Sequence, residues 1–447
     1  MATQGIFPLD GVKSECWLLR FDKNGECLSP NARAQLFNSL QSSDLGRVIL
    51  ISHGWNNDFA DAADLYREFM LQFEALASNS APTLKTIVVG VIWPSSWAPH
   101  DPGPIIAGSA GGASDDPADP ARMLLQNLPE VDRQRGDTLL AKPMLDQDEA
   151  AELAGHVAAA LADEGLDSLR EAAEAAPSAA DVLEAMRALA AGDGEEPAWD
   201  AWTSAPTAVP ETDVAIGNPA AAGLFGIDPL MAVRVFTVYQ MKDRAGRVGA
   251  TGVRALLDDL LMQTAHAVHC VGHSYGCKAL LSALCSAPAP TRPVESMLLL
   301  EPAISHLCFA ATVPGRPGPG GYRDALSESH VVQPILSTYS RWDMPLHTIF
   351  HLALRRKGDL GELQIAAVGE GTRAGDPPSV YCALGGYGPR GADEALIDPL
   401  PEAGEVYALP PGHRIYAFDG TLDKRISGHG DVATDLTAWA LLQQMTS

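Results

Sequence analysis

The sequence predicts an α/β fold with a doubly wound, mostly parallel sheet, into which a helical insertion or cap is spliced. Short continuous apolar runs alternate with helical patterns in both outer parts of the chain, as in sheets covered by helices on both faces. The middle part lacks this alternation. The 447 residues accordingly divide into a first part of the core, 1–100, an acidic insertion rich in Ala, Gly and Pro, 101–227, and a second part of the core, 228–447.

The first part of the core contains three strand-like runs, Cys16–Phe21, Val48–Ser52 and Thr86–Ile92. The second and third are short continuous apolar runs, which indicates strands buried on both faces of a parallel sheet. Asp58 can cap a helix between them, and apolar residues recur after it at helical spacing. They are Phe59, Ala63, Tyr66, Met70 and Phe73. A strand–helix–strand unit implies a parallel pair with a right-handed crossover.

The insertion has no Phe, Trp or Tyr between Ala98 and Ala198. Two Ala-rich stretches, Asp148–Glu164 and Ser178–Ala191, are typical of amphipathic helices, with Ser178 as an N-cap. We expect a thinly packed, mobile lid over the ligand-binding edge of the sheet; the alternative is an exposed acidic insertion without a catalytic part. The residues expected to face the pocket or the core are Leu153, Val157, Leu161, Leu183, Met186 and Leu189.

Strand–helix alternation returns in the second part of the core. The expected strands are Ala265–Val271, Ser296–Leu300, Gln333–Ser340 and His413–Phe418. The expected helices are Cys277–Leu284 and Val432–Gln444. The two outer parts therefore complete a single sheet.

Charge and composition restrict the partners. Thirty-one Lys and Arg against 56 Asp and Glu give a formal net charge of −25, which repels nucleic acid and anionic membranes. We expect no nucleic-acid partner and no integral membrane segment, because no apolar stretch approaches the roughly 18–20 residues that a membrane span needs. The N-terminal residues show no secretory signal, so we expect a cytoplasmic location.

The seven cysteines are odd in number and lack metal-type spacing. A two-residue turn at Asn24-Gly25 pairs Asp22 with Cys27 and puts Cys16 opposite Arg33. We therefore expect free thiols rather than a bridge between these two cysteines, in agreement with a reducing compartment.

The motif Gly272-His273-Ser274-Tyr275-Gly276 lies between a predicted strand and a predicted helix. A nucleophilic serine on a strained turn at the carboxyl end of a central strand needs this context, and small flanking residues avoid clashes there. We therefore identify Ser274 as the candidate nucleophile, the alternative being a Gly-rich turn.

A serine hydroxyl needs a base, and a histidine must supply it. His429 follows the strand His413–Phe418, whereas His413 precedes that strand and so lies at the opposite end of the sheet. His273, next to the serine, points the wrong way. We expect His429 to be the base.

The acid that orients the base should lie between them in the chain. Asp343 follows the predicted strand Gln333–Ser340 and would hold the imidazole in one tautomer. Asp419 and Asp423 are alternatives. For the oxyanion, the expected donors are the backbone N–H groups of Tyr275 and Trp55. Trp55 belongs to the loop Ser52–Asn57, in which His53 is expected to be a structural hydrogen-bonding residue.

The loop His53–Asn57, the strand end Trp93-Pro94-Ser95, the serine motif and the contexts of Asp343 and His429 together resemble α/β-hydrolase-fold serine esterases and lipases. The nearest likeness is to poorly characterised bacterial members, and it covers about residues 15–100 and 228–447. The resemblance implies acyl transfer to Ser274 and hydrolysis by water, with a small-molecule or lipid ester as substrate and no cofactor or metal. A serine peptidase or amidase of the same fold, or a non-catalytic binding protein, is the alternative.

Overall fold

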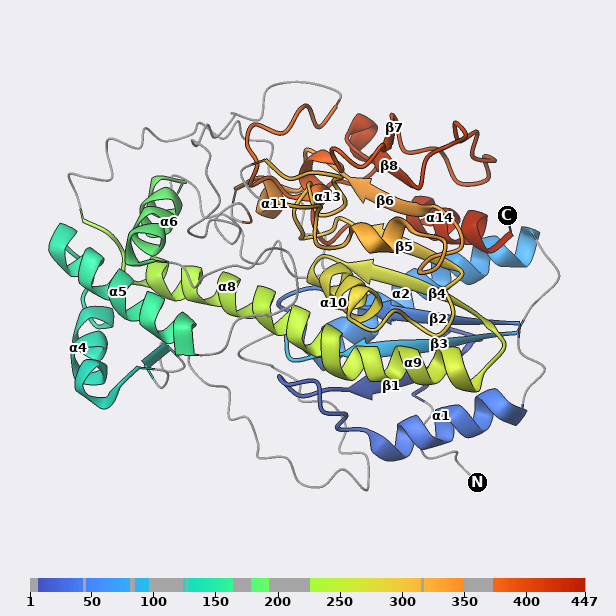
Figure 1. Ribbon diagram of the computed structural model, residues 1–447, viewed down its shortest axis with the longest axis horizontal. Helices are drawn as coiled ribbons and strands as arrows, with labels where there is room; N and C mark the ends of the chain where they lie inside the picture. The colour runs from blue at the N-terminus through green and yellow to red at the C-terminus, as the bar shows by residue number, and fades with distance from the viewer. Residues whose placement is uncertain are drawn as a thin grey trace.

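The computed structural model describes residues 7–42, 46–80, 85–95, 124–125, 128–163, 178–192, 226–314, 317–348, 350 and 373–446. One eight-stranded sheet with all strands parallel forms its centre, and helices cover both faces (Figure 1). The strands are β1 (Glu15–Arg20), β2 (Arg47–Ser52), β3 (Thr86–Ile92), β4 (Ala267–His273), β5 (Ser296–Leu300), β6 (Ile335–Tyr339), β7 (Ala395–Ile397) and β8 (Ile415–Asp419).

The sheet has the strand order β1-β3-β2-β4-β5-β6-β8-β7. From β2 the chain continues to β3, toward the β1 edge of the sheet. From β4 it continues through β5 and β6 toward the β7 edge, so the direction of winding reverses between β2 and β4. Ligands bind at such a switch point in open α/β sheets, outside the carboxyl ends of the strands. The loops that follow β2 and β4 therefore meet at the edge where a site is expected.

The helices pack in two layers with separate apolar cores. α2 and α14 pack on one face, while α1, α8, α9 and α10 lie on the other (Figure 1). The longer helices are α1 (Pro30–Ser42), α2 (Phe59–Ser80), α4 (Glu130–Leu140), α5 (Gln147–Asp163), α6 (Ala179–Gly192), α8 (Leu230–Val248), α9 (Arg254–Gln263), α10 (Tyr275–Cys285) and α14 (Asp435–Thr446). The short helical segments are η2 (Gly249–Val253), η3 (Arg323–Leu326), α11 (Met344–Thr348), α13 (Leu384–Tyr387) and η4 (Leu422–Lys424).

α2 begins as its sequence predicts. The carboxylate of Asp58 accepts hydrogen bonds from the backbone N–H groups of Ala60 (2.8 Å) and Asp61 (3.0 Å), and so caps the helix. The Asp61 carboxylate accepts from the N–H of Asp58 in return (3.0 Å). All five apolar residues expected on one face of this helix are buried. The β2–α2–β3 unit is parallel, as predicted.

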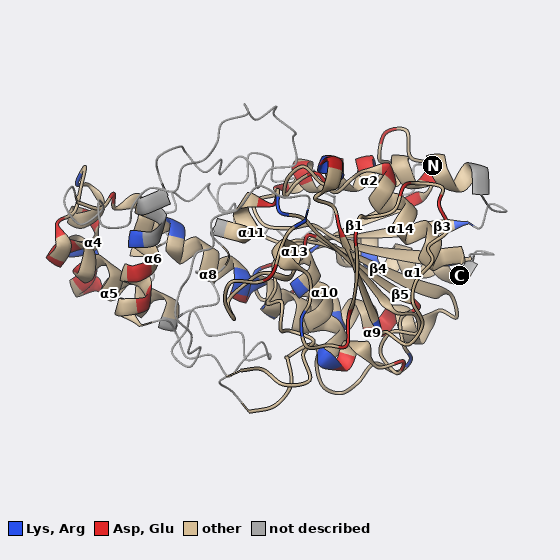
Figure 2. Ribbon diagram, turned by 90° about the horizontal axis from the view of Figure 1, so that it is seen from above, with Lys and Arg blue, Asp and Glu red and all other residues tan. Residues whose placement is uncertain are grey.

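The helices α4, α5 and α6 of the insertion lie beyond the carboxyl ends of the strands, beside the first part of α8 (Figure 1). The hydroxyl of Ser178 accepts the N–H of Asp181 (3.2 Å) and caps α6, as predicted. Acidic and basic residues both occur on these helices (Figure 2), and Arg135 of α4 pairs with Glu152 of α5 at 2.6 Å.

Thin packing, expected for the insertion, is wrong for its described helices. Leu153, Val157, Leu161 and Met186 are almost completely buried in the core that includes α8, and Leu183 is half-buried. These apolar side chains of α5 and α6 form part of one core with α8 although the insertion helices contain no Phe, Trp or Tyr. Residues 96–123, 164–177 and 193–225 and the side chain of Leu189 lie outside the described residues.

The turn after β1 differs from the expected two-residue hairpin. The N–H of Asp22 donates to the carbonyl of Glu26 (2.9 Å), and Phe21 pairs with Cys27. The register is shifted because the carboxylate of Asp22 accepts the N–H groups of Asn24 and Glu26 and closes a wider turn. None of the seven cysteines, all of which lie in the described part of the chain, forms a disulfide.

Candidate active site

Ser274 occupies a strained turn between β4 and α10. Its φ of 55° and ψ of −125° are unfavourable for a residue with a side chain. The turn persists because its surroundings fix it: the N–H of Ser274 donates to the carbonyl of Leu300 at 3.0 Å. A Cβ at Gly272 would stand 2.8 Å from the Cα of Cys277, and one at Gly276 would stand 2.2 Å from the carbonyl oxygen of Ser52. Both flanking glycines are therefore required by close backbone packing.

The side chains of Ser274, His429 and Asp343 form a hydrogen-bonded chain. Nε2 of His429 lies 2.8 Å from Oγ of Ser274, and Nδ1 of His429 lies 2.7 Å from Oδ2 of Asp343. All three residues are buried. Because a carboxylate only accepts, Nδ1 carries the hydrogen and Nε2 is left as the acceptor of the Ser274 hydroxyl. The imidazole is thus in the tautomer that a general base needs.

Asp343 follows β6 and is held by its own loop. Its Oδ1 accepts the N–H of Leu346 at 3.0 Å, at the start of α11. The hydroxyl of Ser340 donates to the carbonyl of Ile426 at 2.8 Å and ties the loop of the acid to the loop that carries His429. The carboxyl ends of β6 and β8 are adjacent in the sheet, which brings residues 86 positions apart into contact.

The rival carboxylates and histidine are engaged elsewhere. Asp419, at the end of β8, is buried and accepts the N–H groups of Thr421 and Ala374, each at 2.9 Å. Asp423 is exposed in η4. His413 precedes β8, and its Nδ1–H donates to the carbonyl of Asp393 at 2.7 Å. The structure therefore brings Asp343, rather than these groups, to His429.

His273 has a place in the site that its sequence position did not reveal. Its Nε2–H donates to the carbonyl oxygen of His429 at 2.8 Å, and the two rings lie 5.0 Å apart. Burial, together with the nearby His429, lowers the pKa of His273 to about 3. His273 is therefore neutral and holds the backbone of His429. Strand alternation predicts that it points away from Ser274, but not that the loop of His429 crosses this side.

The loop after β2 lies against the nucleophile. A Cβ at Gly54 would stand 2.6 Å from Cβ and 3.1 Å from Oγ of Ser274. Asn56 adopts a φ of 56°, and its N–H donates to the carbonyl of Ser95 at 3.0 Å. The side-chain amide of Asn57 donates to the carbonyl of Trp55 at 2.8 Å. These bonds fix the backbone of Trp55 beside the serine.

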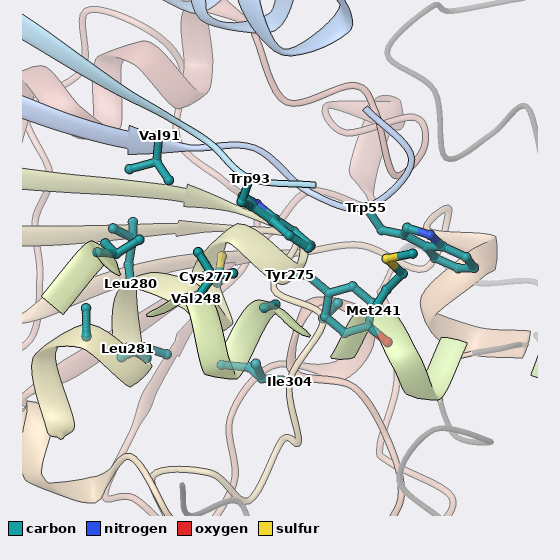
Figure 3. Packing of buried hydrophobic residues seen from close by; sticks show 14 of the residues in the cluster. Trp55, Val91, Trp93, Met241, Val248, Tyr275, Cys277, Leu280, Leu281 and Ile304 are labelled. Atoms are coloured by element: carbon teal, nitrogen blue, oxygen red, sulfur yellow. The ribbon is translucent and has the colours of Figure 1, made fainter. Parts of the chain in front are cut away.

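Trp55 and Tyr275, the two residues expected to supply oxyanion donors, are neighbours. Their rings lie 6.4 Å apart, and Met241 of α8 lies beside them (Figure 3). Tyr275 is the first residue of α10, so its N–H belongs to the turn of a helix whose N–H groups have no acceptor within the helix. The positive end of the helix dipole also favours negative charge at this place.

His53 supports this loop and acts as a structural hydrogen-bonding residue, as expected. Its ring stacks on Trp93 with centroids 5.5 Å apart, and its Nε2 accepts the N–H of Trp93 at 3.2 Å. Its Nδ1–H donates to the carbonyl of Gly54 at 2.9 Å. Burial lowers the pKa of His53 to about 4, so the ring is neutral near pH 7.

In the described part of the chain, no group of three or more His, Cys, Asp or Glu side chains is arranged to hold a metal ion. No helix there combines the length and the apolar composition needed to cross a bilayer. Comparisons of the chain with protein-family models, with curated proteins and with solved structures find no match.

Proposed function

We propose that this protein is a serine hydrolase that cleaves a carboxylic ester of a small molecule or lipid through an acyl-enzyme on Ser274. The observation that carries the proposal is the chain of short contacts from Ser274 to His429 and Asp343 at a strained turn. Such a buried, pre-aligned set activates a serine that would otherwise be a poor nucleophile.

The order of these groups along the chain supports the α/β-hydrolase fold as the finer classification. The serine follows β4, the acid follows β6 and the histidine follows β8, which is the Ser–Asp–His order of that fold. The parallel sheet and the reversal of winding between β2 and β4 agree with it.

The geometry supports a two-step reaction. Oγ of Ser274 attacks the ester carbonyl carbon while its proton passes to Nε2 of His429, and Asp343 stabilises the resulting imidazolium. The oxyanion accepts hydrogen bonds from the N–H groups of Trp55 and Tyr275. Nε2–H then protonates the departing alkoxide, and an acyl ester remains on Ser274.

Water completes the cycle by the same route in reverse. It gives one proton to Nε2 of His429 as its oxygen attacks the acyl carbon, and the proton returns to Oγ of Ser274 as the acid product leaves. Each proton that is taken up in one step is released in the next. The side chains at the site therefore suffice for the proposed chemistry.

The test is steady-state hydrolysis of chromogenic esters of graded acyl length and of the matching anilides, by the wild-type protein and Ser274→Ala. We expect ester turnover that Ser274→Ala reduces by several powers of ten, since the members of such a set act together. Faster cleavage of the anilides would favour an amidase or peptidase instead. No turnover of either series would favour a binding protein.

A further inference from the structure

Glu301 is a buried carboxyl group directly behind the candidate site. It follows Leu300, the last residue of β5, whose carbonyl holds the N–H of Ser274. Its side chain is 0% exposed, and its φ of 42° lies in the left-handed region. Strain and a buried carboxyl group both cost free energy. A close contact confines the backbone, since a Cβ at Gly385 would stand 2.5 Å from the carbonyl carbon of Glu301.

The surroundings of Glu301 disfavour a negative charge. Neither carboxyl oxygen has a hydrogen-bond partner of good geometry among the described residues. Burial first, and then the negative charge of the nearby Asp343, raise the pKa of Glu301 well above its usual range. Asp419 acts in the same direction, and the Thr338 hydroxyl offsets the shift only in part.

The titratable neighbours identify which carboxyl group keeps a proton. Asp343 accepts hydrogen bonds from Nδ1–H of His429 and from the N–H of Leu346, whereas no donor of good geometry among the described residues reaches the carboxyl oxygens of Glu301. His347, from α11, has a pKa lowered by burial, and its Nε2–H donates to the carbonyl of Ser340 rather than to a carboxylate. Two adjacent carboxyl groups do not both ionise readily in a buried site, so the proton belongs on Glu301.

We propose that Glu301 is a positioning residue that keeps its proton and donates it in a hydrogen bond to Asp343, thereby fixing the carboxylate that orients His429. The role in orienting a base rests on the proposed hydrolase function. As a neutral donor, Glu301 withdraws part of the negative charge of Asp343 without adding a second charge beside the imidazole. It thereby also limits how strongly Asp343 favours the imidazolium form of His429.

The first test requires no enzymatic activity. Above the ordinary pKa of a glutamate, the folded protein would hold a proton on Glu301 that the unfolded chain releases, so the contribution of Glu301 to stability falls as the pH rises. Glu301→Gln has no such proton. Its urea midpoint should therefore exceed that of the wild type by a margin that grows from pH 5 to pH 8, whereas the exposed control Glu26→Gln should show no growing margin. A constant difference between Glu301→Gln and the wild type would overturn the proposal.

The second test measures the pH dependence of kcat/KM. Glu301→Gln keeps a neutral donor, so the acid side of its kcat/KM profile should coincide with that of the wild type. Glu301→Met keeps the size of the side chain but loses the donor. Its kcat should fall by about tenfold at unchanged KM. The midpoint of the acid side of its kcat/KM profile should move up by about half a pH unit, because Asp343 loses the hydrogen bond that draws off part of its charge.

Two results would contradict the assignment. A downward shift of the acid side of the profile in Glu301→Gln would mean that Glu301 is ionised, because removing a negative charge destabilises the imidazolium. If folded Glu301→Met has the same acid side of the kcat/KM profile as the wild type, Glu301 only fills space. If the wild-type protein hydrolyses nothing, the proposed function fails, and the stability comparison still decides whether Glu301 holds its proton.

Discussion

Gly54 and Ser274 approach each other so closely that a Cβ on Gly54 would stand 2.6 Å from the Cβ of Ser274. The contact joins the loop after β2 to the turn after β4 at the switch point of the sheet. A glycine is required here because a Cβ would collide with Ser274, and the proposed mechanism needs the Trp55 N–H within reach of the oxyanion.

Gly54→Ala should displace this loop or the serine by a substantial fraction of an ångström. Because misplacement of about 1 Å at a reacting centre costs about 10²-fold in rate, we expect a loss of that order in kcat/KM. Gly155→Ala is the matched control, since a Cβ there would meet no atom within 4 Å. Equal activity of both variants would show that the loop does not serve the site.

The acid is tested by comparing two isosteric changes. Asp343→Asn should lower kcat by about 10⁴-fold, because an amide at this position favours the wrong tautomer of His429. Asp419→Asn should cost about 1–3 kcal/mol of unfolding free energy, because it weakens one buried and one partly buried hydrogen bond, and should leave kcat near that of the wild type. Our choice of the acid is wrong if Asp419→Asn is the crippling change.

The histidine next to the nucleophile should matter through its hydrogen bond. His273→Leu loses the donor to the carbonyl of His429, and we expect kcat to fall about tenfold, which corresponds to about 1.4 kcal/mol. His273→Gln, whose amide can donate to the same carbonyl, should recover most of this loss. If His273→Gln is as impaired as His273→Leu, the ring itself and not its N–H is needed.

Buried neutral histidines should make the fold sensitive to mild acid. Burial lowers the pKa values of His269 and His306 to about 4, below their value in the unfolded chain. The unfolded chain therefore binds more protons between about pH 6.5 and 4, and stability falls as the pH falls, by about 1.4 kcal/mol per pH unit for each histidine.

His269→Asn should reduce this slope by the contribution of one histidine, and His306→Asn should do so independently. Urea unfolding at pH 7, 6 and 5 measures the effect. Slopes equal to that of the wild type in both variants would show that these rings are already charged in the folded protein.

Much of this architecture could be predicted because buried parallel strands leave a plain sequence pattern. β3 and β5 have the predicted bounds, and Ser274, His429 and Asp343 follow β4, β8 and β6 as expected. The edge strand β7 was not predicted, because a strand of only three residues leaves too short a pattern in the sequence. Glu301 carried a weak signal, a carboxyl group at a strand end, but its contact with Asp343 depends on how β5 and β6 pair.

α8 shows a different limit. Its run Val233–Tyr239 is rich in β-branched and aromatic residues and has only Arg234 and Thr237 as polar residues, so the sequence gives little sign of a helix. The helix forms because α10 and the insertion helices α5 and α6 bury it. Whether the insertion acts as a lid over Ser274 stays a prediction; its described helices pack against α8.

The most direct measurement of the central claim is labelling by a fluorophosphonate probe, followed by peptide mass spectrometry. Such a probe modifies an activated serine and leaves an ordinary one untouched. We expect one adduct, on Ser274, which is absent in Ser274→Ala and strongly slowed in His429→Ala, while His413→Ala labels like the wild type. No adduct on Ser274 in the folded wild-type protein, or undiminished labelling of Ser274→Ala, would contradict the account.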